Sequence, residues 1–96
     1  MFRFNLKTTV LTATMLLASN MATAGPECTV QPESKWMGMY DMQKKIINDY
    51  GFTIKLFKID DSCYEIYGWE EKKGHVDKIE VYFNPVNGDI VKKVID

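Results

Sequence analysis

The chain has 96 residues with a formal net charge of −1, and 46% of the residues are hydrophobic. This length allows one small domain and excludes a two-domain enzyme. Lysines alternate with acids along the chain, so the concentrated basic face that nucleic acid binding requires is not expected.

The first 24 residues have the three parts of a secretory signal peptide. Arg3 and Lys7 give a positive start, an apolar run covers residues 10–18, and Ala22-Thr23-Ala24 forms a small-residue cleavage site. The run is shorter than the roughly twenty residues that a transmembrane helix needs. We therefore predict cleavage near Ala24-Gly25, no transmembrane segment after cleavage, and a periplasmic or secreted protein. The predicted domain plan is a signal peptide over 1–24, an extended arm over 25–33 and a folded domain over 34–96.

The two cysteines predict one disulfide bond. Cys28 and Cys63 both lie in the part expected to be exported into an oxidising compartment, and their even number leaves no free thiol. Closing a loop of about 35 residues would stabilise the fold by roughly 4 kcal/mol. A redox or metal pair is the alternative, but the chain has no C-x-x-C and a single histidine. We expect no cofactor and no metal.

The segment before Gly51 has helical periodicity. Ser34 suits an N-cap, and Gly51 is the residue type that often ends a helix. We expect one amphipathic helix over Lys35–Tyr50. Its predicted apolar face comprises Trp36, Met39, Tyr40, Ile47 and Tyr50, with Gln43 on the same stripe and Met42 and Ile46 widening it.

After Gly51 the apolar residues alternate with a period of two, which predicts strands. A change of parity between Leu56 and Phe57 indicates a bulge or a two-sided strand. The connections are too short for parallel crossovers, so the sheet should be an antiparallel meander. The expected class is α+β, with one N-terminal amphipathic helix packed on a three- to four-stranded sheet. The expected strands are Phe52–Ile59, Cys63–Glu70, Val76–Asn84 and Ile90–Ile95.

Three aromatic residues fall on the strand parity opposite the predicted core. Tyr67, Trp69 and Tyr82 are therefore candidates for an exposed binding face. Glu65 shares that face, where a charge must be exposed, paired with a cross-strand lysine such as Lys55 or Lys78, or used in recognition. Trp69 could also form a peptide cleft with Trp36, or Trp36 could instead be a lid on the core.

A catalytic interpretation has little support. His75 lies in a predicted turn beside Gly74, and the acid pairs Asp60-Asp61 and Glu70-Glu71 flank turns, where acids serve solubility and capping. The sequence therefore predicts no catalytic residue and a protein that is not an enzyme.

Residues 81–91, VYFNPVNGDIV, resemble the ending v-y-v-D-P-x-T-G-x-v-v of the PepSY domain family, in its small stand-alone exported form. Cys28, Trp36, Gly51-Phe52 and residues 63–67 also fit the pattern, whereas Asn84 and Asn87 replace Asp and Thr. The resemblance implies an antiparallel sheet packed on a helix and a role in restraining or regulating a peptidase. It suggests a non-catalytic binding module that contacts a peptidase or another envelope protein through its sheet face or a strand edge. The alternative is a structural or ligand-sensing accessory protein of the envelope with no peptidase partner.

Overall fold

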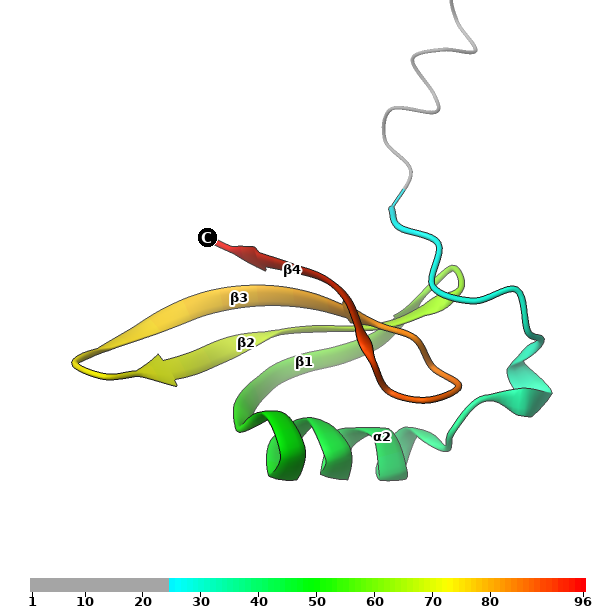
Figure 1. The fold of residues 1–96 in the computed structure, drawn as a ribbon, viewed down its shortest axis with the longest axis horizontal. Coiled ribbons are helices and arrows are strands. Elements are labelled where there is room, and N and C mark those ends of the chain that lie inside the picture. The colour runs from blue at the N-terminus through cyan, green and yellow to red at the C-terminus, as the bar shows by residue number, and fades with distance from the viewer. Residues whose placement is uncertain (1–24) are drawn as a thin grey trace, which may run out of the picture.

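The computed structural model describes residues 25–96, so the predicted signal peptide lies outside the described residues (Figure 1). The four strands form one antiparallel sheet in the order β1-β2-β3-β4, and the helical segment packs against one side of it. This arrangement confirms the α+β class, although the helix follows an arm and a short 3-10 turn. The elements in chain order are η1 (Glu33–Lys35), α2 (Met39–Lys45), η2 (Ile46–Tyr50), β1 (Phe52–Asp60), β2 (Cys63–Lys72), β3 (His75–Phe83) and β4 (Ile90–Ile95).

The predicted start of the helix is wrong. Ser34 lies inside η1, and α2 begins only after Gly38, whose ψ of 151° is extended. The cause is tertiary, because the Met37 N–H donates to the Pro85 carbonyl at 2.8 Å and the Tyr64 hydroxyl donates to the Met37 carbonyl at 2.6 Å. These bonds tie the Met37 backbone to β2 and to the turn after β3, and not to a helix.

The predicted apolar face of the helix is also wrong for most of its members. Met42 and Ile46 are fully buried, whereas Met39, Tyr40 and Ile47 are 51%, 73% and 52% exposed. The buried residues are spaced by four along one narrow line that continues to Tyr50. The helix contacts the sheet along this line alone, so the residues that flank the line face solvent.

The bulge predicted in the first strand is present. The pairing of β1 with β2 shifts between Ile54 and Leu56, which leaves Lys55 as the extra residue. The shift returns Phe57 to the helix side, where it packs against Tyr64 with ring centroids 5.0 Å apart. The buried core comprises Met42, Ile46, Phe52, Tyr64, Ile66, Ile79, Val81 and Phe83.

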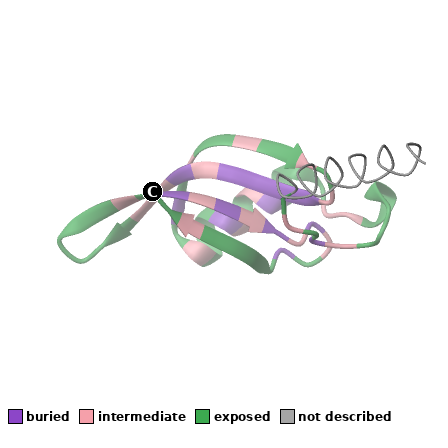
Figure 2. Cartoon of the chain, turned by 90° about the horizontal axis from the view of Figure 1, so that it is seen from above, coloured by how far each residue is buried: buried purple, intermediate pink, exposed green. Residues whose placement is uncertain are grey.

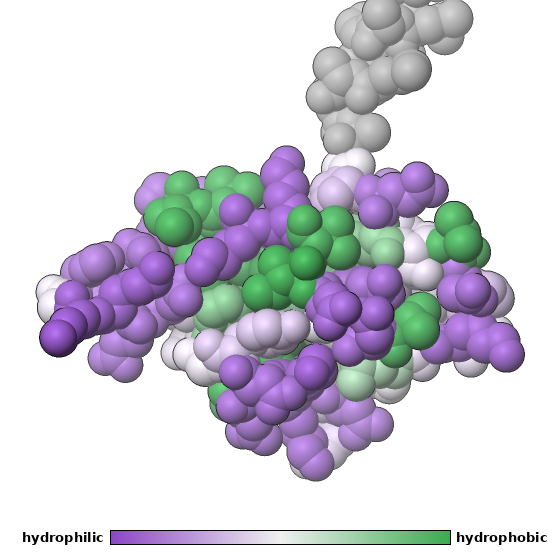
Figure 3. Space-filling model, viewed as in Figure 1, coloured by the Kyte–Doolittle hydropathy of each residue, from purple (hydrophilic) through white to green (hydrophobic). Residues whose placement is uncertain are grey.

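Figure 2 views the sheet from the side opposite the helix and shows the buried residues gathered on the two central strands. The β2–β3 hairpin extends beyond the helix, and its tip is exposed. On the surface, hydrophilic residues separate the exposed apolar residues into several patches (Figure 3). None of the helices within residues 25–96 is long and apolar enough to cross a membrane.

The turn between β3 and β4 is held by the two asparagines that depart from the family pattern. The Asn84 side-chain oxygen accepts from the Val86 N–H, and the Asn87 side-chain oxygen accepts from the Asp89 N–H, both at 2.9 Å. These bonds are the ones that Asp or Thr would make at such positions, so the substitutions preserve the turn.

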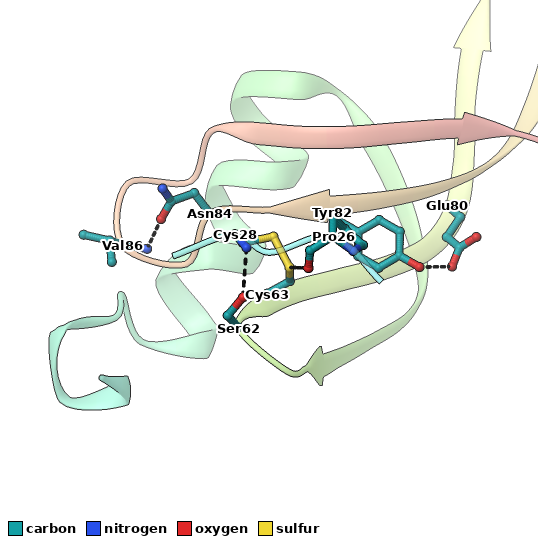
Figure 4. The surroundings of a disulfide bond; sticks show 8 residues. All are labelled: Pro26, Cys28, Ser62, Cys63, Glu80, Tyr82, Asn84 and Val86. Carbon is teal, nitrogen blue, oxygen red and sulfur yellow. Dashed lines mark hydrogen bonds between the residues drawn. A yellow bond between two sulfur atoms is a disulfide. The ribbon is translucent and has the colours of Figure 1, made fainter. Parts of the chain in front are cut away.

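A disulfide joins Cys28 to Cys63 and fastens the arm to the start of β2, as the cysteine count predicted (Figure 4). Ser62 reinforces the attachment, because its hydroxyl oxygen accepts from the Cys28 N–H at 2.8 Å. The Pro26 carbonyl oxygen lies 3.3 Å from the Cys63 sulfur. The arm therefore passes over the end of the sheet beside the β1–β2 turn.

Replacing both cysteines, as Cys28→Ala with Cys63→Ala, should lower the free energy of unfolding by about 2–5 kcal/mol, because the unfolded chain regains the freedom of a long loop. Urea unfolding monitored by circular dichroism would measure the loss. A variant as stable as the oxidised wild-type protein would contradict the structure, and two labelled thiols in the denatured, unreduced protein would show that the bond is absent.

Gly68 is expected to tolerate no side chain. It lies opposite Ile54, and a Cβ there would overlap the carbonyl oxygen of Thr53 beside the bulge. Gly68→Ala should therefore cost about 1–3 kcal/mol in urea unfolding, because β1 and β2 must move apart. Gly38→Ala is the matched control, since its Cβ would meet no atom closer than 3.9 Å. Equal stability of the two variants would refute the close approach.

Candidate binding face

We use the term open face for the side of the sheet opposite α2 and η2. Because side chains alternate along strands, it carries Glu65, Tyr67, Trp69 and Tyr82, the four residues that the sequence singled out. Strand pairing arranges them in cross-strand rows. The rows are Lys58–Glu65–Tyr82–Lys92, Leu56–Tyr67–Glu80–Val94 and Trp69–Lys78.

Glu65 is a buried acid in the middle of this face. Its exposed fraction is 2%, and its carboxylate Oε1 lies 3.7 Å from the Lys58 Nζ. The predicted pairing of Glu65 with a cross-strand lysine is therefore present, but the lysine is Lys58 and not Lys55 or Lys78. The one-residue bulge in β1 places Lys58 directly opposite Glu65, whereas Lys78 lies opposite Trp69.

Glu80 completes a network that the sequence did not reveal. It comes from β3, where it lies opposite Tyr67, and its Oε2 accepts a hydrogen bond from the Tyr82 hydroxyl at 2.7 Å. Its carboxyl group also shares a hydrogen bond with that of Glu65. A hydrogen bond between two carboxyl groups needs a proton on one of them, so the contact is favourable only while one of the two groups is protonated.

The pKa values of the two groups indicate that Glu65 carries the shared proton. Burial, followed by the hydrogen bond with Glu80, raises the pKa of Glu65 to about 7 from its usual 4.5. The same hydrogen bond lowers the pKa of Glu80, which also accepts from Tyr82. Two acids with separated pKa values therefore act as one proton-sharing pair that titrates near neutral pH.

The two tyrosines surround this acid pair as hydrogen-bond donors. A hydrogen bond to Glu80 raises the pKa of Tyr67 to about 12, and burial raises the pKa of Tyr82. Both phenols are therefore neutral at physiological pH. The Lys58 ammonium also lies 5.8 Å from the centre of the Tyr67 ring, a cation–π contact.

Trp69 lies one row beyond the network and lines a separate shallow pocket of about 180 Å³. Tyr67 and Gly68 line the pocket on β2, Lys55 on β1, and Lys78 and Ile79 on β3, with Asp96 at the chain end. Trp36 is on the helix side, where its ring packs edge-on against Tyr64 at 5.4 Å. The peptide cleft between Trp36 and Trp69 is therefore wrong, and Trp36 forms a lid on the core.

Of the residues considered for catalysis, His75 lies near the hairpin tip, whereas burial and, to a lesser extent, the charge of Asp60 raise the pKa of Glu65. The His75 side chain is 60% exposed near the hairpin tip, with its Nε2 3.3 Å from the Asp77 Oδ1. Within residues 25–96, no three His, Cys, Asp or Glu side chains are grouped to hold a metal ion. The chemistry that this face offers is the uptake or release of one proton, hydrogen bonding and aromatic contact.

Comparison with known proteins gives one match. The family model described as peptidase propeptide and YPEB domain matches residues 8–94. No curated protein and no solved structure matches the chain significantly.

The acid pair predicts that the protein loses stability as the pH rises. The folded-state pKa of Glu65, about 7, exceeds the unfolded value, so the folded protein binds more protons between about pH 4.5 and 7. Between pH 5 and 8 the free energy of unfolding should fall by roughly 1–3 kcal/mol. Glu65→Gln should remove most of this decrease, because its amide donates to Glu80 at every pH.

Urea unfolding at several pH values would test this expectation, with Glu71→Gln as the control at an exposed acid. Parallel pH profiles for the wild-type protein and Glu65→Gln would show that the two carboxyl groups do not share a proton.

Proposed function

Because this chain belongs to the peptidase propeptide and YPEB domain family, we propose that it is an exported, non-catalytic binding module that restrains or regulates a peptidase of the cell envelope. Domains of this family are associated with peptidases, and the family description names peptidase propeptides. Export is supported by the signal-peptide pattern of residues 1–24 and by the Cys28–Cys63 disulfide, a bond typical of oxidising compartments.

The observation that carries the proposal is the open face itself. Tyr67, Trp69 and Tyr82 lie half-buried around the acid pair, on the side of the sheet that neither α2 nor η2 covers. Aromatic residues contribute most to protein interfaces because they bury large areas at a small cost in conformational entropy. A partner seated there would contact rings that the sheet already holds in place.

Strand addition at an edge is less favoured than binding to the face. The edge strand β4 carries Lys92 and Lys93, and its pairing with β3 shifts between Tyr82 and Phe83. Lysines and bulges at a sheet edge discourage pairing with another strand. The edge strand β1 contains the bulge at Lys55, which interrupts its hydrogen-bonding pattern.

The test begins with the whole 96-residue chain, expressed in its own cells and purified from the envelope. The purified protein should retain a peptidase from envelope or culture-fluid extracts, and adding it should reduce that peptidase's activity in proportion to the amount bound. If no peptidase is retained and no activity changes, the regulatory function is refuted, and the accessory protein without a peptidase partner becomes the better hypothesis.

Trp69→Ala should weaken inhibition of the captured peptidase about tenfold or more, because a ring at the centre of an interface is a typical hot spot. Tyr40→Ala is the matched control, an aromatic that is 73% exposed on the opposite side of the molecule. Equal inhibition by the two variants would exclude the face around Trp69 from the interface. If Trp69→Ala lowered the free energy of unfolding by more than about 3 kcal/mol, Trp69 would belong to the core.

A further inference from the structure

The pocket around Trp69 has the composition of a carboxylate site. Lys78 lies directly opposite Trp69 on β3, and Lys55 approaches from β1 on the other side of the ring. Lys55 reaches the pocket because it is the bulged residue of β1. Bulges commonly redirect a side chain in this way. Two lysines, one from each strand that pairs with β2, therefore line the pocket beside one indole ring.

Both ammonium groups are available for a ligand. Among residues 25–96, every lysine ion pair shorter than 4.0 Å involves Lys45, Lys58, Lys72 or Lys93, and none involves Lys55 or Lys78. Asp96 lines the same pocket and bonds through its N–H to the Lys78 carbonyl, but its side-chain carboxyl forms no ion pair with either lysine. Among the residues that line the pocket, two lysines therefore stand against one acidic side chain, and neither lysine is held in an ion pair.

We propose that this pocket binds an acidic side chain of an extended segment of a partner protein. The inference rests on the proposed function and adds the chemistry of the partner. Lys55 and Lys78 would hold the carboxylate, while the rings of Tyr67 and Trp69 would pack against its apolar stem.

The charge and size of the site favour a peptide segment. On the open face Lys58 is paired with Glu65, so the lysines free of ion pairs beside the pocket are Lys55 and Lys78. With Asp96 as the one acidic side chain of the lining, the side chains of the pocket carry an excess of one positive charge, which complements an acidic side chain of a partner. A pocket of about 180 Å³ is smaller than the roughly 300–1,000 Å³ of typical small-molecule sites, and it suits a single side chain.

Titration with synthetic peptides, followed by the indole N–H resonances of the whole protein, tests the proposal. The probe is acetyl-Val-Asp-Val-Glu-Val-amide, and its neutral counterpart is acetyl-Val-Asn-Val-Gln-Val-amide. The acidic peptide should shift the Trp69 resonance and bind at least five times more tightly than the neutral one. The Trp36 resonance, on the other side of the sheet, should not move.

Variants then assign the binding to the two lysines. Lys55→Gln with Lys78→Gln should weaken binding about tenfold. Lys35→Gln with Lys44→Gln removes the same charge elsewhere and should leave binding within twofold. Asp96→Asn should strengthen binding, because it removes a competing carboxylate from the pocket.

Equal affinity for the acidic and neutral peptides, or equal affinity of the two lysine double variants, would overturn the proposal. Competition by free succinate at the affinity of the peptide would overturn it as well, because the site would then recognise a small acid. These outcomes are distinguishable from a failure of the proposed function, since the titration uses no peptidase. A peptidase that is captured equally well by Lys55→Gln with Lys78→Gln would preserve the regulatory function and exclude this pocket.

Discussion

The bulge at Lys55 sets the register between β1 and β2, and both sides of the sheet depend on it. On the helix side it returns Phe57 to the core, against Tyr64. On the open face it places Lys58 opposite Glu65 and turns Lys55 toward Trp69. Without the extra residue, the side chains of β1 on one side of the bulge would point to the opposite faces of the sheet, because side chains alternate with a period of two.

Gly68 makes this register possible. It pairs with Ile54 immediately before the shift, where the Thr53 carbonyl oxygen occupies the space that a Cβ would need. The bulge and the glycine therefore form one structural unit. The disulfide acts at the other end of the same strand pair, where Cys63 begins β2 beside the β1–β2 turn.

The acid pair on the open face is costly for a small domain, since burying a carboxyl group requires a compensating partner. Glu65 has three kinds of partner, the proton shared with Glu80, the Lys58 ammonium, and the tyrosines that donate to the pair. A fully connected network of this kind fixes the orientation of its side chains. It therefore holds the rings of Tyr67 and Tyr82 in place for the partner that we propose, and its charge depends on pH near neutrality.

The network and the Trp69 pocket divide the open face into two chemically different parts. The acid pair is internally compensated and accepts or releases one proton, whereas Lys55 and Lys78 form no ion pair shorter than 4.0 Å within residues 25–96. The first part would tune the charge of the face, and the second would select an acidic segment. The family is associated with peptidases, which is compatible with the peptidase partner that we propose for the open face.

The sequence by itself determined the features that depend on local patterns. Alternation of apolar residues predicted the four strands, the parity change after Leu56 predicted the bulge, and two cysteines predicted the disulfide. The same alternation placed Glu65 and Trp69 on one face. Each of these predictions needs only the period of a strand or a count of residues. None of them requires knowing which residues distant in the sequence come into contact.

Only the tertiary structure decided which residues meet across elements. The helix begins after Gly38 because Met37 bonds to Pro85 and Tyr64, which are distant in the sequence. Lys58, and not Lys55 or Lys78, pairs with Glu65 because a one-residue bulge changes the register between strands. In the sequence Glu80 resembles any outward acid of a strand. It becomes the partner of Glu65 only when β2 and β3 lie side by side, since register across a sheet is a property of pairing and not of either strand.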